Sequence, residues 1–344
     1  MILCLLLSGA ASADEIDNYV NSEMQKHLIP GASLLVLRTN QVVKRATYGL
    51  ANVELRVAVV PETAFEIGSL TKQFTAACVL LLAQDGKLSI DDPISRYLHV
   101  PDSWQSITIR HLLTHTSGIK TYTVLDGFEL RRHLSQTQFI EALAAHPLDF
   151  PPGQAFKYCN SGYNLLGFII ENVSGKSYWD FLSQRILAPL GMNATTNRLP
   201  ALIIPNRAAG YEQTNHIWIN RDYDLTDVFS AGAIISTVGD LAKWNASLDA
   251  GTLLTSATRQ QMWTPARLND GSLTKYGFGW RLEEFEGHKD IGHGGSTSGF
   301  SASLQRFPDD QLAVILLTNT DEQIATLIAR NVARFYFAAQ PKQR

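Results

Sequence analysis

The hydrophobic and polar positions predict strands at both ends of the chain. Residues 31–49 form two largely apolar runs around the polar pair Thr39-Asn40, which predicts an antiparallel hairpin. Residues 300–318 repeat this arrangement around a Pro-Asp-Asp turn, and residues 322–338 have helical spacing. The chain therefore begins and ends with elements suited to one sheet.

The middle of the chain is predicted to be mostly helical. Helical spacing recurs around Leu80 and over residues 139–145, 163–173, 178–187 and 241–248, between loops rich in proline and glycine. We therefore predict an α/β (α+β) fold, in which an antiparallel sheet formed by both chain ends is flanked by helices and a mostly helical domain is inserted.

The predicted domain boundaries follow from this order of elements. Residues 14–85 and 230–344 are expected to form one discontinuous α/β domain, and residues 86–229 the helical domain. The 344 residues are 45% hydrophobic and 18% charged, which is typical of a globular chain with a large core. With a net charge of -3 and no basic run, the chain gives no reason to expect nucleic acid as a partner.

The N-terminus predicts export. In residues 1–13 an apolar segment too short to span a bilayer precedes Ala11-Ser12-Ala13, a small-residue cleavage pattern. We interpret it as a signal peptide and expect a periplasmic or secreted protein without a stable membrane anchor after its removal. The usual basic start is missing, and a buried N-terminal segment is the alternative. The two remaining cysteines, Cys78 and Cys159, are expected to be free rather than paired.

Three tetrapeptides match S-x-x-K, a pattern that places a hydroxyl and an amine on one face when it lies on a helix. Residues 117–120 contain glycine and predict a turn. Residues 272–275 precede a glycine-broken alternation, which predicts a strand or loop. Only Ser69-Leu70-Thr71-Lys72 opens a long apolar helical run, which ends at Gly86.

Ser69 and Lys72 indicate acyl transfer. Lys72 can accept the Ser69 proton if burial and neighbouring cations hold the amine neutral. At the start of a helix, free N–H groups and the helix dipole favour the negative charge that develops during attack.

Two further motifs follow downstream. Tyr158-Cys159-Asn160 contains a phenol that we expect to lose its proton readily near ammonium groups, so Tyr158 is a candidate to share the base role and to protonate a leaving group. His293-Gly294-Gly295 precedes an alternating strand, and glycines there allow a strand edge to approach an acyl group. The alternatives are a buried tyrosine, a loop-capping asparagine and a structural histidine.

With these three motifs in order, the chain after residue 13 resembles the serine β-lactamase-like superfamily: class C β-lactamases, D-alanyl-D-alanine peptidases, D-aminopeptidases and related esterases. The resemblance implies a β-lactamase/transpeptidase-like fold and a mechanism that needs no cofactor or metal. The implied catalytic residues are Ser69, Lys72 and Tyr158, and the implied substrate-binding residues are Asn160, His293, Gly294, Gly295 and Ser296.

The resemblance also assigns individual roles. The N–H groups of Ser69 and Ser296 would hold the oxyanion, and Asn160 would bond Lys72 and the substrate. His111 and His115 lie four residues apart, but their segment is common in this superfamily and is set aside as a metal site.

Many relatives carry K-T-G where this chain has His293-Gly294-Gly295. Free imidazole has a pKa of about 6.5 and is mostly neutral at pH 7, so we expect weak anchoring of carboxylates. The expected function is a serine hydrolase acting through an acyl-enzyme on small esters or amides. D-alanyl-D-alanine carboxypeptidase, D-aminopeptidase and weak class C-like β-lactamase activities remain open, as does a non-hydrolytic penicillin- or peptidoglycan-binding protein.

Overall fold

The structure is a computed structural model that describes residues 13–125, 134–215, 217–221 and 224–337. The predicted signal peptide, apart from Ala13, lies outside the described residues, and export remains a prediction. Within the described ranges, no helix has both the length and the apolar character needed to cross a membrane.

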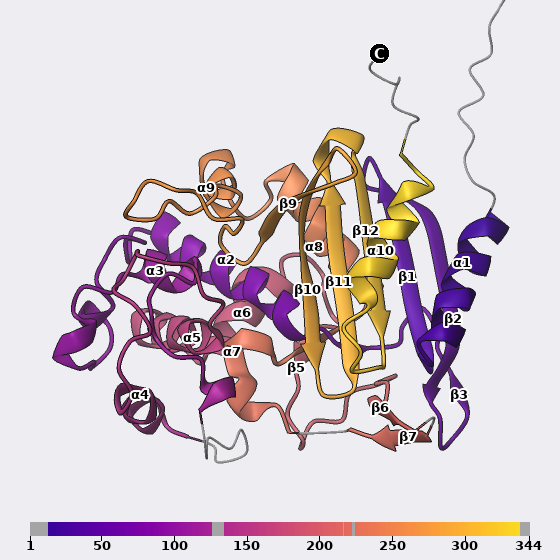
Figure 1. The fold of residues 1–344 in the computed structure, drawn as a ribbon, viewed down its shortest axis with the longest axis horizontal. Helices are drawn as coiled ribbons and strands as arrows, with labels where there is room; N and C mark the ends of the chain where they lie inside the picture. The colour runs from indigo at the N-terminus through magenta and orange to yellow at the C-terminus, as the bar shows by residue number, and fades with distance from the viewer. Residues whose placement is uncertain (1–12, 126–133, 216, 222–223, 338–344) are drawn as a thin grey trace, which may run out of the picture.

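A seven-stranded antiparallel sheet forms one side of the molecule, with strand order β3-β2-β1-β12-β11-β10-β9 (Figure 1). Its strands are β1 (Gly31–Arg38), β2 (Gln41–Asn52), β3 (Val57–Ala58), β9 (Arg281–Phe285), β10 (His288–Thr297), β11 (Phe300–Phe307) and β12 (Leu312–Thr318). β1 pairs with β12, with Leu35 opposite Ile315, so the two chain ends meet at the centre of the sheet. The predicted sheet is therefore confirmed.

Four helices cover the two faces of this sheet: α1 (Ala13–Lys26) and α10 (Ala325–Arg334) on one face, α2 (Thr71–Gln84) and α8 (Val238–Ala250) on the other. Alternate residues of β1 enter the two cores: Leu34 faces α1 and α10, and Leu35 faces the opposite core. Because both faces are covered, the central strands β1 and β12 are mainly apolar instead of alternating.

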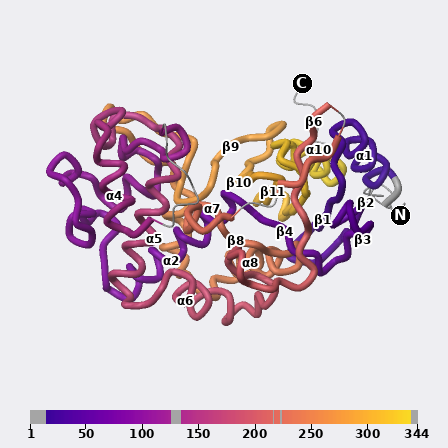
Figure 2. The backbone as a smooth tube through the Cα atoms, turned by 90° about the horizontal axis from the view of Figure 1, so that it is seen from below, coloured from indigo at the N-terminus to yellow at the C-terminus, as the bar shows by residue number. Residues whose placement is uncertain are grey.

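The remaining helices gather beside the sheet (Figures 1 and 2). They are α3 (Ile109–Leu113), α4 (Gln136–Ala144), α5 (Asn160–Ser174), α6 (Tyr178–Leu182), α7 (Phe229–Gly232) and α9 (Ser256–Met262). Two small sheets complete the fold: β4 (Phe65–Glu66) and β5 (Thr196–Asn197) flank β8 (Ile234–Ser236), and β6 (Tyr211–Thr214) pairs with β7 (Ile217–Asn220). A single hydrophobic core joins residues from both predicted domains, and the boundaries at residues 86 and 229 remain predictions.

Helix α2 runs through the interior between the sheet and the helical side. Every residue from Thr71 to Leu82 is buried, which explains why its apolar positions are nearly continuous rather than confined to one stripe. Cys78 in α2 and Cys159 before α5 are buried and free, as predicted.

Candidate active site

Ser69 lies in the short 3-10 turn Gly68–Leu70, which leads directly into α2 and its first-turn residue Lys72. Lys72 Nζ lies 3.0 Å from Ser69 Oγ and donates a hydrogen bond to the carbonyl oxygen of Ala231 at 2.8 Å. The Lys72 side chain is fully buried, and burial lowers its pKa to about 7. The pair therefore places an amine that is about half deprotonated at pH 7 beside a partly exposed hydroxyl.

The other two S-x-x-K copies have the predicted irregular structure. Residues 117–120 follow α3 as a loop, and residues 272–275 lie outside any helix. Only the copy at Ser69 brings the serine and the lysine together at the start of a helix.

Tyr158 lies directly beside this pair. Its ring centroid is 4.9 Å from Lys72 Nζ, and its buried hydroxyl forms no hydrogen bond with any described residue. Burial raises the pKa of Tyr158, and the neighbouring Ser69 hydroxyl and Arg281 guanidinium offset only part of this effect. The direction is opposite to the one expected from the sequence, because Lys72 is itself depleted of charge and burial disfavours the phenolate.

Asn160 is the first residue of α5, and its side chain faces the same cavity as Ser69 and Tyr158. Its backbone N–H donates to Thr121 Oγ1 at 3.2 Å. The hydrogen bond between Asn160 and Lys72 that the resemblance implies is not formed within the described residues; the carbonyl of Ala231 takes that place.

His115 packs against the ring of Tyr158 and binds the backbone next to it. Its Nδ1 accepts the backbone N–H of Cys159 at 3.1 Å, and its ring lies 4.3 Å from that of Tyr158, centroid to centroid. Complete burial lowers the pKa of His115 well below its ordinary value, so the ring is neutral. In His111, Nδ1 accepts the N–H of Thr108 instead, and no group of three potential metal ligands occurs among the described residues.

His293 is also neutral. Its Nδ1 lies 2.5 Å from the carbonyl oxygen of Gly294 and must donate there, so Nε2 accepts from the hydroxyl of Tyr276 at 2.9 Å. Burial lowers the pKa of His293 to about 3. The sequence analysis did not identify Tyr276, although it directly follows the third S-x-x-K copy.

Glycines bring strand β10 against the turn that carries Ser69. A Cβ on Gly295 would lie 1.9 Å from the carbonyl oxygen of Ile67 and 3.0 Å from Ser69 N, and a Cβ on Gly68 would lie 2.6 Å from Ser296 N. Any side chain at Gly295 would push the strand away. This close approach sets the backbones of Ser69 and Ser296 side by side, where their N–H groups can act as a pair of donors.

A cavity of about 600 Å³, which we call the Ser69 cavity, connects these groups to solvent. Pairing between β9 and β10 ends at Gly292, so the next residues of β10 form an edge of the cavity. Its lining includes Ser69, Tyr158, Asn160, His293, Gly294, Gly295 and Ser296, together with Arg281 and Glu283 from β9, Gln323 just before α10, and Thr326 and Arg330 from α10. Every predicted site residue except the buried Lys72 thus faces one cavity, and Lys72 bonds Ser69 from beneath it.

The residues from β9 and α10 were not predicted from the sequence. Arg281 stands out, since its guanidinium carbon lies 5.9 Å from the centre of the Tyr158 ring. No sequence pattern marks these residues, because only the strand pairing and the packing of α10 bring them to Ser69.

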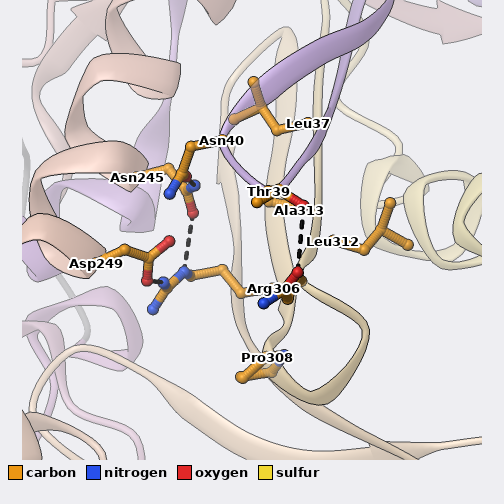
Figure 3. Close-up of a pocket in the computed structure, with 10 residues that line it drawn as sticks. Leu37, Thr39, Asn40, Asn245, Asp249, Arg306, Pro308, Leu312 and Ala313 are labelled. Carbon is orange, nitrogen blue, oxygen red and sulfur yellow. Dashed lines mark hydrogen bonds and ion pairs between the residues drawn. The ribbon is translucent and has the colours of Figure 1, made fainter.

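A second cavity of about 260 Å³ lies at the β1–β2 turn (Figure 3). There the buried Arg306 donates to Asn245 Oδ1 at 2.8 Å and forms an ion pair with Asp249, and its guanidinium also packs over Trp263. Its lining contains no nucleophile beside a base, so the chemistry points to the Ser69 cavity.

Comparisons with known proteins identify the family of this chain. A family model described as Beta-lactamase matches residues 16–338. Penicillin-binding protein 4* of Bacillus subtilis is 30% identical over 322 residues, which cover 87% of this chain and 70% of that protein. The chain spans 64–70% of the length of the first curated relatives that it matches.

Solved structures of similar proteins share the whole fold. A penicillin binding protein from Bacillus halodurans has a TM-score of 0.81 and 26% identity, covering 92% of this chain and 99% of that one. A D-stereospecific amidohydrolase from Streptomyces sp. has a TM-score of 0.79 and 25% identity, covering 94% and 99%.

Proposed function

The chain belongs to the Beta-lactamase family and is a serine hydrolase of that superfamily, and from this premise we propose that Ser69 is its nucleophile and that small esters or amides are its substrates. The observation that carries the proposal is the contact between Ser69 Oγ and the fully buried Lys72 Nζ at 3.0 Å. Because the pKa of Lys72 is about 7, a large fraction of the amine is free to accept a proton at neutral pH.

Acylation begins when Ser69 Oγ attacks the substrate carbonyl carbon and its proton passes to Lys72 Nζ. The carbonyl oxygen becomes an oxyanion, for which the N–H groups of Ser69 and Ser296 are the proposed donors. Collapse of this intermediate breaks the bond to the leaving group. The products are an ester of Ser69 and a leaving group that takes up one proton.

Tyr158 is the proposed proton donor to the leaving group. Its raised pKa keeps the phenol protonated, and its hydroxyl has no other hydrogen-bond partner among the described residues. After Tyr158 donates, the proton that Lys72 took from Ser69 can pass to Tyr158, whose ring lies 4.9 Å from Nζ. A water molecule then attacks the acyl-enzyme and loses a proton to Lys72. When the acid leaves, Lys72 passes this proton to Ser69 Oγ, which restores both groups.

Uncharged substrates are favoured by the state of His293. A neutral imidazole at this place offers no cation to a substrate carboxylate, and the cavity arginines Arg281 and Arg330 both pair with Glu283, which supports short-chain esters and simple amides over cephalosporins. The amidohydrolase named above is D-stereospecific, and amides of D-amino acids are accordingly part of the proposed substrate range.

The test compares two serines that head identical tetrapeptides. Ser69→Ala should abolish hydrolysis of p-nitrophenyl acetate, while Ser272→Ala, which changes the matching copy in a loop, should retain it. Intact-mass spectrometry during turnover should show one acetyl group on the wild type and none on Ser69→Ala. Full activity in folded Ser69→Ala would refute the proposed nucleophile.

A non-hydrolytic penicillin-binding protein is the second candidate, favoured by the names of several relatives. The same mass measurement after exposure to penicillin separates the two functions. Rapid return to the unmodified mass identifies a hydrolase, whereas an adduct that persists for hours identifies a binding protein. A panel of esters, D-alanyl peptides and β-lactams then defines the substrate class.

A further inference from the structure

We propose that Thr326 of α10 determines leaving-group specificity by supplying to the Ser69 cavity the hydroxyl that strand β10 lacks at Gly294. The proposal rests on the proposed function, because it requires acyl transfer to Ser69. The substrate group that it would bind is a leaving group that carries a hydrogen-bond-accepting oxygen, either a neutral carbonyl or a carboxylate.

Side chains alternate between the two faces of strand β10. Gly295 faces Ser69, as its contacts with the turn before α2 require. Its neighbour Gly294 must face the other way, toward α10. A Cβ built on Gly294 would lie only 2.7 Å from Thr326 Oγ1.

The space beside Gly294 is occupied by the hydroxyl of Thr326. Relatives with K-T-G carry threonine where this chain has Gly294, and its hydroxyl would lie one bond beyond the Cβ. In this chain the oxygen of Thr326 lies next to that position instead. The hydroxyl is therefore present at the edge of β10, but it comes from a helix rather than from the strand.

The Thr326 hydroxyl is free to bind a substrate in the Ser69 cavity. Thr326 is partly exposed and lines the same cavity as Ser69 and Tyr158. No hydrogen bond joins its side chain to any of the described residues, so both its donor and its acceptor capacity are open to a substrate.

Helix α10 holds this hydroxyl at a fixed place. The N–H of Ala325 donates to Ser301 Oγ at 3.3 Å, which ties the start of the helix to β11. One turn further on, Arg330 Nε donates to the buried Asp290 of β10 at 2.7 Å and also pairs with Glu283 of β9. Because three strands anchor the helix, Thr326 is preorganised relative to the strand edge.

The surroundings indicate the chemistry that fits. The groups that share the cavity with Thr326 include the donors Gln323, Arg281 and Arg330. Arg281 lies over the ring of Tyr158, the proposed proton donor to the leaving group, which places this region on the leaving-group side of the scissile bond. A leaving group with an accepting oxygen would meet donors there.

The experiment uses three aryl acetates that share one acyl group: phenyl acetate, 3-acetylphenyl acetate and 3-carboxyphenyl acetate. The quantity compared is kcat/KM for each oxygen-bearing ester relative to phenyl acetate. Thr326→Val keeps the shape and removes the hydroxyl, and it should lower this ratio by about two- to tenfold for at least one of the two oxygen-bearing esters. A loss with 3-acetylphenyl acetate identifies a neutral acceptor, and a loss confined to 3-carboxyphenyl acetate identifies a carboxylate. Thr326→Ser should keep the ratio.

A relocation variant provides the decisive control. In Gly294→Thr/Thr326→Ala the new side chain on β10 has room, because the Cβ of residue 326 is 3.9 Å from the Cβ of residue 294. This double variant should regain most of the ratio lost in Thr326→Val, whereas Thr326→Ala alone, which lacks the new threonine on β10, should not.

The results separate this proposal from the proposed function. Unchanged ratios for both oxygen-bearing esters in folded Thr326→Val, or no recovery in the folded double variant, would overturn the role of Thr326 even when mass spectrometry still finds the acyl group on Ser69. Absence of any acyl group on Ser69 during turnover would instead overturn the proposed function.

Discussion

The pH dependence of acylation tests the central contact of the site, because it reports the protonation state of Lys72. Only the neutral amine can accept the Ser69 proton. With a pKa of about 7, about one tenth of the Lys72 side chains are neutral at pH 6, half at pH 7 and nine tenths at pH 8. The value of kcat/KM should therefore rise by roughly tenfold between pH 6 and pH 8.

Above pH 8 the profile should be level. Burial raises the pKa of Tyr158, so this phenol stays protonated as the pH approaches 9 and introduces no descending limb there. His293, with a pKa lowered to about 3, and His115, also lowered, do not titrate in this range either. A single bend near pH 7 is the expected shape.

The assay is steady-state hydrolysis of p-nitrophenyl acetate from pH 5.5 to 9, followed at the isosbestic wavelength of the product and corrected for spontaneous hydrolysis. Lys72→Arg serves as the matched variant, because its guanidinium stays protonated at every pH used. It should lose roughly two decades or more of kcat/KM. A profile that is flat across pH 6–8, or one that bends near the ordinary lysine pKa of 10.5, would refute the assignment of Lys72 as base.

Three further predictions follow from packing and burial. Gly295→Ala should lower kcat/KM by about a hundredfold, because the new methyl group pushes β10 away from Ser69. In the control Gly239→Ala the new Cβ has its nearest neighbour at 3.7 Å, so kcat/KM should stay within about twofold of the wild-type value. Equal effects of the two changes would contradict this prediction. Lys72→Met should raise the free energy of unfolding at pH 7 by a few kcal/mol. Between about pH 7 and 10.5 the lysine is protonated in the unfolded chain but neutral in the folded one, which costs stability at about 1.4 kcal/mol per pKa unit, and methionine removes this cost. The gain in urea denaturation should shrink toward pH 10, and a gain that grows with pH would count against it. Arg306→Ala should lower the free energy of unfolding by about 1–3 kcal/mol, because its removal leaves the buried Asn245 Oδ1 without its donor, and kcat/KM should stay within about twofold; a large loss of activity would give the cavity of Figure 3 a role in catalysis.

The secondary structure and the contact between Ser69 and Lys72 were predictable because their signals are local. The hairpin over 31–49 and the strands over 300–318 show as apolar runs with turn residues between them, and each extends over less than 20 residues. The copy of S-x-x-K at Ser69 differs from the other two because a glycine-free apolar run follows it. This run is apolar because helix α2 is buried on all sides. Helix α10 is shorter than the predicted segment 322–338, since helix ends depend on contacts as well as spacing.

The charge states at the site depend instead on the tertiary structure. The sequence placed Tyr158 near Lys72 and predicted an easily lost phenol proton, but enclosure of the ring raises its pKa. For His293 the sequence predicted a mostly neutral ring, and burial makes it far more so. Desolvation is set by everything packed around a group, and no short motif records it.

The composition of the cavity was likewise decided by the fold. No motif marks Arg281 or Thr326 as a site residue, and both line the Ser69 cavity only because β9 pairs with β10 and α10 packs across the sheet. The sequence by itself determined which residues can do acyl-transfer chemistry, because that chemistry needs a few residue types at fixed local spacing. The tertiary structure alone determined the protonation states of those residues and which other side chains line the Ser69 cavity, because desolvation and long-range contacts arise only when distant segments pack together.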